Sequence, residues 1–489
     1  MPERNSLPMI DVTAALKAIP TFTKFCSVQE LHTLAESLRA GSNGFHVALA
    51  GSSTGGIPIY HIRFGTGSLK VLVVGFPHCN EPIGGLTVFS LMTLLRDGNP
   101  GLVNADVEWH IVPCIDPDGA TLNEGWTQQP FSLGSHMRNY YKQVPRDQVE
   151  CSFPLQHKRL EFNQPTAEAM VLQSLLERIR PDFFFSLHNT NAGGVWYPTS
   201  RDLGEECYQQ LYELLRSYDM PLRQHPPYSQ WCPVYGRGVV DIVTTKKSYD
   251  HLERTISRPE EQLDYGANSW EFLAQIKEQA VTFVTEVPYL KHPADSSKKP
   301  VPGSLRQLKL RIDAERKFIV TVVLDEWDRL QADLNNTSPF FRQTLNYFVS
   351  VRQHLPAGLP SWNMKTHDLL FNPAYNRGMT EDEHLNEYMY WYYLLCVAYG
   401  FVRLLRASPQ TAAVTQATLR LESFFDNALN DIANNIGVDK FVTVDHRTLA
   451  RVQLGSGLIA VNALLREGKF ARTDSAELRR ACGFAQGWA

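Results

Sequence analysis

The sequence predicts an α/β fold in which a mostly parallel mixed sheet is flanked by helices, followed by an all-helical domain. Before about residue 300, short apolar runs typical of buried strands alternate with amphipathic helix-like segments, as a parallel sheet requires. After it, long helix-like segments follow one another and almost nothing resembles a strand. We expect an N-terminal helical segment (1–45) that belongs to the α/β domain, the main body of that domain (46–290), a linker (291–304) and a helical domain (305–489).

Three of the predicted strands end in side chains that can bind a metal. The apolar run 71–74 is followed by His78 and Glu81, the run 182–187 ends at His188, and the β-branched run 280–285 ends at Glu286. The carboxyl ends of strands in such sheets are where ligands bind, so we expect these four side chains at one edge. Imidazole and carboxylate are zinc ligands, and three protein ligands leave a position open for water. A fourth, free carboxylate can then act as general base.

The helices are predicted from capping and periodicity. Ser27 and Glu30 form a capping box that opens an N-terminal helix, and Thr380 with Glu383 forms a second one. The segment 165–180 is expected to be the helix that leads into the His188 strand. The helical domain is expected to be a bundle with helices at 305–334, 380–405, 411–435 and 446–467. His384 and Glu387 repeat the H-x-x-E spacing inside a helix, where we expect an ordinary surface pair rather than a metal site.

Six short motifs, in order along the chain, resemble those of the zinc carboxypeptidases of the carboxypeptidase A type. The resemblance covers about half of the chain, from about Gly51 to about Tyr289. Each motif alone is weak, and their common order makes the resemblance specific. The motifs are Gly51–Ile59 (entry hairpin), His78–Glu81 (first ligand pair), Asp116–Gly119 (N-P-D-G turn), Arg138–Tyr140 (R-N-aromatic), Ser186–His188 (third ligand) and Thr285–Glu286 (catalytic glutamate).

The resemblance implies a carboxypeptidase-like fold and a zinc-dependent hydrolase that cleaves an amide (peptide) bond next to a carboxylate. His78, Glu81 and His188 would hold one zinc ion per chain. Glu286 would be the general base that activates water and then the acid that protonates the leaving amine. Arg138 would clamp the substrate carboxylate. Asn139 would also bind the substrate, and so would Tyr265, the expected aromatic lid residue.

The chain departs from the family pattern around the expected clamp. Residues 120–137 contain no Arg or Lys, although the family usually has a second arginine there. Met137 and Ser135 replace a usual Asn and a usual Asp that orients a ligand histidine. Either another residue supplies these functions, or the substrate is not a simple peptide C-terminus. The second reading favours a small-molecule amidase or N-acyl amino acid deacylase, and a non-catalytic zinc-binding protein is the remaining alternative.

The composition is that of an ordinary enzyme. A net charge of −4 and the absence of P-loop or dinucleotide motifs argue against nucleic-acid and nucleotide partners. The uncharged stretch 388–402 is shorter than the roughly 20 residues of a membrane span, so no membrane partner is expected. Eight cysteines without a C-x-x-C pair and no export signal predict a cytoplasmic protein with reduced thiols. The dense aromatic cluster at 388–399 is expected to fill the core and one buried interface. Alternatively, the helical domain packs beside the active site or forms a homo-oligomer, and the sequence does not decide between them.

Overall fold

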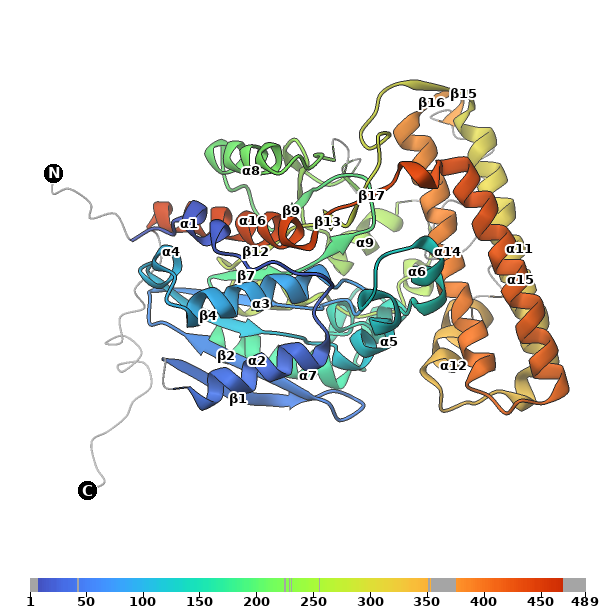
Figure 1. Ribbon diagram of the computed structural model, residues 1–489, viewed down its shortest axis with the longest axis horizontal. Helices are drawn as coiled ribbons and strands as arrows, with labels where there is room; N and C mark the ends of the chain where they lie inside the picture. Colours follow the sequence, from blue (N-terminus) through green and yellow to red (C-terminus); the bar gives the residue numbers. More distant parts are fainter. Residues whose placement is uncertain are drawn as a thin grey trace.

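The protein folds into a helix-flanked sheet and a neighbouring helical bundle, which lie side by side in Figure 1. The computed structural model describes residues 8–468 except 42–43, 224–225, 228, 230, 255, 351 and 353–374. The predicted fold class, a mixed sheet flanked by helices with a helical region after it, is confirmed.

The central sheet has nine strands in the order β1-β2-β4-β3-β7-β12-β9-β11-β10. The middle strands β4, β3, β7 and β12 are parallel, whereas β1 and β2 form an antiparallel hairpin at one edge. The carboxyl ends of β3, β7 and β12 therefore lie at the same edge of the sheet, as the sequence predicts. The strands are β1 (Phe45–Ser52), β2 (Pro58–Phe64), β3 (Leu69–Val74), β4 (Val107–Val112), β7 (Phe183–Ser186), β9 (Tyr197–Thr199), β10 (Val234–Gly236), β11 (Val239–Asp241) and β12 (Val281–Val284).

Helices cover both faces of the sheet. Alternate residues of each strand point to opposite faces, so Val71 and Val73 join one core cluster whereas Leu72 and Val74 join another. The first face is covered by α1 (Val12–Lys17), α2 (Val28–Ala40), α3 (Ile83–Arg96), α8 (Glu205–Ser217) and α16 (His446–Glu467). The second face is covered by α7 (Ala167–Ile179), α9 (Thr245–Leu252) and α10 (Ser269–Ile276). The predicted capping box at the start of α2 is present.

The helical bundle is built from α11 (Leu305–Leu330), α12 (Pro339–Thr344), α14 (Glu381–Arg406) and α15 (Ala412–Ile436) around its own core. The predicted capping box opens α14 at Thr380. Glu387 pairs with Lys309 of α11 in a contact between the two helices where both side chains are largely buried, which differs from the expected surface pair with His384. The aromatic cluster faces the sheet domain: the Tyr392 hydroxyl lies 2.8 Å from Nδ1 of His136. The cluster thus packs beside the α/β domain, and the predicted homo-oligomer stays a prediction.

The last described helix, α16, packs on the sheet and not in the bundle. Its residues 449–465 belong to the core cluster of the sheet, and Gln453 donates a 2.6 Å hydrogen bond to the backbone oxygen of His188. Gly457 lets the helix come close, because a Cβ there would lie 2.2 Å from the Phe185 ring. The predicted helical domain of 305–489 therefore contains one helix that completes the α/β domain (Figure 1).

Two further expectations concern thiols and membranes. The seven cysteines in the described part of the chain are free, and Cys482 lies outside it. Among the described helices, α16 alone is long and apolar enough to span a membrane by length and composition, and 89% of its most apolar window is buried inside the protein.

Candidate metal centre

His78, Glu81 and His188 converge at the carboxyl edge of the sheet. Their ligand atoms all lie within 4.8 Å of one another. The Glu81 carboxylate sits between the two rings, 2.8 Å from Nδ1 of His78 and 3.0 Å from Nδ1 of His188. Two imidazole nitrogens and a carboxylate form a donor set that zinc accepts, so the residues fit the metal that the sequence predicts.

Strand register brings these side chains together. Val74 of β3 is level with Ser186 of β7, so the residues that follow each strand emerge at the same edge. His78 comes after a sharp turn in which Phe76 adopts a positive φ of 55°. Gly84, in the first turn of α3, allows the helix to approach this edge, because a Cβ there would lie 3.1 Å from Leu187.

A buried hydrogen-bond chain orients the His188 ring. Its Nε2 lies 3.1 Å from the Ser186 hydroxyl, which donates a 2.6 Å bond to the Glu150 carboxylate. Glu150 is fully buried and is held in turn by the Ser269 hydroxyl. Because Nε2 has this acceptor chain, the proton is favoured there and Nδ1 is left to face Glu81. Such outer partners fix the tautomer and tune the affinity of metal ligands.

The electrostatics of the three residues fit a cation between them. Burial raises the pKa of Glu81, but the two neighbouring histidines lower it by a larger amount, so the net shift is downward. The pKa of His188 is lowered by burial but raised more by Glu81, so its net shift is upward. The pKa of His78 is lowered, mainly by burial. Glu81 is therefore held as a carboxylate that attracts positive charge.

Glu286 lies beside this group. It follows β12, and its backbone exchanges hydrogen bonds with Trp196, at 3.0 and 3.3 Å. Asn189 is level with Val287 in the short parallel pair β8 (Asn189–Thr190) and β13 (Val287–Pro288), so the preceding residues, His188 and Glu286, are neighbours. Burial and the charge of Glu81 raise the pKa of Glu286 to about 7. A carboxyl group with such a pKa can hold and release a proton near neutral pH.

The predicted substrate-binding residues Arg138, Asn139 and Tyr265 have contacts in the surrounding scaffold. Arg138, in the last turn of α6 (Leu133–Asn139), donates a 2.6 Å bond to Asp426 of α15, and about 40% of its side chain is exposed. The amide nitrogen of Asn139 donates to the backbone oxygen of Ser135. Tyr265 packs against the core cluster on the second face of the sheet. The contacts of Arg138 and Asn139 thus tie α6 to the bundle and to itself, and the substrate-binding roles of Arg138, Asn139 and Tyr265 stay predictions.

The polar residues of the 120–137 window are used in the scaffold. Asn123 donates to the backbone oxygens of Cys79 and Tyr141, and Trp126 donates to Asn123. His136 is buried among aromatic rings, and burial lowers its pKa to about 3. Asn123 therefore holds the backbone at Cys79 and Tyr141, and Trp126 and His136 belong to the packing around it.

Two cations near the centre were not predicted. Lys142 and Arg223 both lower the pKa of Glu286 through their charges. Lys142 stands four residues after Arg138, in the segment after α6, and a search for basic residues beyond the R-N motif would have found it. Arg223 follows α8, and no sequence signal indicates it.

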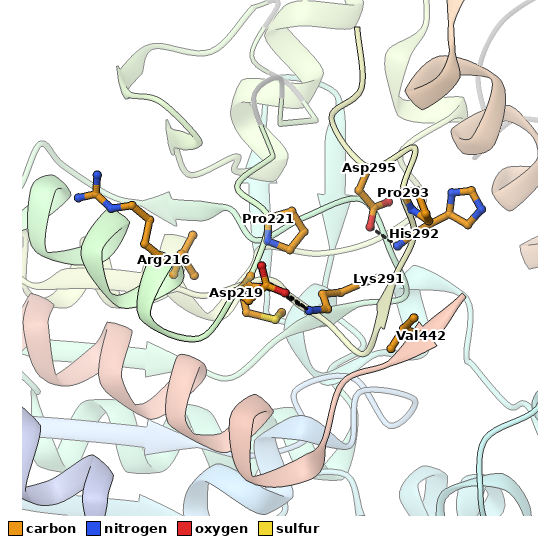
Figure 2. A pocket seen from close by; sticks show the side chains of 10 residues that line it. Arg216, Asp219, Pro221, Lys291, His292, Pro293, Asp295 and Val442 are labelled. Carbon is orange, nitrogen blue, oxygen red and sulfur yellow. Dashed lines mark hydrogen bonds and ion pairs between the residues drawn. The ribbon is translucent and has the colours of Figure 1, made fainter. Parts of the chain in front are cut away.

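A separate surface pocket lies between the end of α8 and the linker (Figure 2). Its charged side chains all have partners, including Arg216, which pairs with Glu213 of the same helix. Lys291 bonds Asp219 at 2.8 Å, and Asp295 accepts a 2.7 Å bond from the backbone of His292. None of the residues of the metal centre lines this pocket.

Comparison with known proteins gives a likeness of fold. No family model matches the chain, and no curated protein matches it. Among the solved structures that it resembles are several carboxypeptidases. Carboxypeptidase A from Helicoverpa armigera is 14% identical with a TM-score of 0.35, over 57% of this chain and 69% of that one. A metallo-carboxypeptidase from Pseudomonas aeruginosa is 16% identical with a TM-score of 0.32, over 54% and 60%. One from Burkholderia cenocepacia is 14% identical with a TM-score of 0.28, over 54% and 60%. Values this low carry no information on the activity of this chain.

Proposed function

We propose that the protein is a zinc-dependent, carboxypeptidase-like hydrolase that cleaves an amide bond next to a carboxylate in a peptide or a small molecule. The observation that carries the proposal is the meeting of two imidazoles and a carboxylate within 4.8 Å, with Glu286 beside them. His78, Glu81 and His188 would hold the ion. When bound, zinc supplies a Lewis acid that polarises the substrate carbonyl.

The remaining chemistry falls to Glu286. Its carboxylate would accept a proton from the attacking water and donate it to the amine that leaves. The raised pKa suits this exchange, because a general base works best when its pKa is near the working pH. Glu81 and His188 are buried, whereas His78 is partly exposed and is the ligand that solvent or a substrate can reach.

The test is hydrolysis of a panel of peptides and N-acyl amino acids by the zinc-loaded protein. Glu286→Gln should retain zinc and lose about 10²–10⁴-fold in kcat. Glu278→Gln, an exposed glutamate in the turn before β12, is the matched control and should keep full activity. Near-normal turnover in Glu286→Gln would refute the proposal. Activity on peptides or only on N-acyl amino acids separates a carboxypeptidase from a small-molecule amidase.

A further inference from the structure

Lys142 brings a cation to the metal centre from the segment that joins the sheet to the bundle. The residues on both sides of Lys142 contact Cys79, which lies between the ligands His78 and Glu81: its thiol is 3.5 Å from the backbone oxygen of Tyr141 and 3.0 Å from Oε1 of Gln143. The charge of Lys142 accordingly acts on both His78 and Glu286. The ammonium nitrogen lies 5.8 Å from the centre of the Tyr393 ring. Within the described part of the chain, Lys142 forms no ion pair with a carboxylate. Its positive charge is therefore available to an anionic ligand.

The backbone around Lys142 is fixed on two sides. On the sheet side, Asn123 bonds both the nitrogen and the oxygen of Tyr141, at 3.0 and 2.9 Å. On the bundle side, Gln343 donates a 3.1 Å bond to the oxygen of Lys142. The hydroxyl of Tyr347 donates a 2.8 Å bond to the next backbone oxygen, that of Gln143. The backbone that carries Lys142 is therefore already ordered before a ligand binds.

Helix α14 forms a wall along this side of the centre. Tyr393, which contacts Lys142, and Asn386 are seven residues apart and so lie on the same face of the helix. Asn386 lies beside the loop after His188, since a Cβ added at Gly193 would be 3.5 Å from its Oδ1 and 3.0 Å from Nη1 of Arg223. The two cations that act on Glu286 thus both lie next to α14.

Arg138, by contrast, already has a carboxylate partner. Its bond to Asp426 ties α6 to the bundle at a half-exposed site. Helix α6 ends at Asn139, between Arg138 and Lys142, and the backbone is extended at Tyr140. The two side chains therefore leave the backbone in different environments.

We infer that Lys142, positioned by Tyr393 of the helical bundle, binds the carboxylate of the substrate in place of the predicted arginine clamp. This inference rests on the proposed function and assigns the substrate specificity of the same site. An ammonium group gives a charge-assisted hydrogen bond to a carboxylate oxygen, so the preferred substrate bears a free carboxylate next to the scissile amide. The bundle is then part of the substrate site and not an accessory domain.

The test measures binding in the zinc-loaded Glu286→Gln protein, which is expected not to turn substrate over. The probes are N-acetyl amino acids with small, aromatic, acidic and basic side chains, each paired with its C-terminal amide, and calorimetry gives Kd. Adding Lys142→Met should weaken binding of the carboxylates about 10- to 100-fold and change binding of the amides less than about threefold. Lys142→Arg should restore most of the carboxylate preference, which a general loss of folding would not allow. Arg138→Met is the matched control and should leave the preference unchanged.

Each outcome decides between the two proposals. Equal carboxylate binding with and without Lys142→Met, or a selective loss in Arg138→Met, would overturn the role of Lys142. Failure of every probe to bind would overturn the carboxylate specificity. If Lys142 controls carboxylate binding but the wild-type protein hydrolyses nothing, the binding inference stands and the proposed hydrolase function falls.

Discussion

Glu286 should destabilise the metal-free protein, and the cost should depend on pH. Its pKa rises from 4.5 to about 7 on folding, mainly because the carboxyl is buried. At about 1.4 kcal/mol per pKa unit, this rise corresponds to at most about 3–4 kcal/mol. The residue as a whole is not fully buried, so solvent screening reduces the cost, and we expect about 2 kcal/mol.

The sign follows from proton binding. Between pH 4.5 and about 7 the folded protein holds the Glu286 proton more tightly than the unfolded chain does. The contribution of Glu286 to the free energy of unfolding is therefore fully present below pH 4.5, and it is lost as the pH rises through about 7. Glu286→Gln, which cannot ionise, should match the wild-type protein near pH 4.5 and exceed it at pH 8.

Urea unfolding of chelator-treated protein at pH 5 and pH 8 measures the difference. Glu278→Gln, at an exposed position before β12, should show no pH-dependent gain. Zinc should reduce the gain of Glu286→Gln, because the ion's positive charge favours the ionised carboxylate. A Glu286→Gln variant that is no more stable than wild type at pH 8 would refute the view that the ionised Glu286 carboxylate destabilises the metal-free fold.

Two further substitutions test the supports of the site. Gly457→Ala should destabilise the protein by about 1–3 kcal/mol in urea unfolding, because the added Cβ would overlap the Phe185 ring. Gly41→Ala is the control and should not, because a Cβ there makes ordinary contacts at 3.6 Å. Ser186→Ala should weaken zinc binding about tenfold in a competition titration, because it cuts the chain to the ligand histidine, whereas Ser90→Ala, which breaks only a bond to its own helix, should not. Unchanged stability in the first case, or unchanged affinity in the second, would contradict these roles.

The part of the site that could be predicted is the part carried by strand ends. An apolar run identifies a buried strand, and parallel strands bring their last residues to one edge, so His78, Glu81, His188 and Glu286 could be placed before any coordinates. Capping boxes likewise located the starts of α2 and α14. These signals are local in sequence, so they can be recognised without knowing how the helices and strands pack.

The environment of the clamp residues could not be predicted in the same way. Whether Arg138 or Lys142 faces the centre depends on α6 ending at Asn139 and on the bundle supplying Asp426 and Tyr393. Those contacts join residues more than 200 positions apart. Periodicity cannot supply them.

The place of α16 is a second case. Its apolar residues indicate a buried helix, but burial does not say against which partner. The close approach depends on Gly457 meeting Phe185 across more than 270 residues. The sequence therefore predicted the helix with its correct ends and assigned it to the bundle, although its core contacts are with the sheet.

Elemental analysis of the purified protein and of His188→Ala tests the central claim most directly. We expect about one zinc ion per wild-type chain and its loss in the variant, with the fold retained by circular dichroism. A wild-type protein that does not bind zinc even after incubation with the ion, or a His188→Ala variant that retains the full metal content, would contradict the metal centre and the hydrolase function built on it.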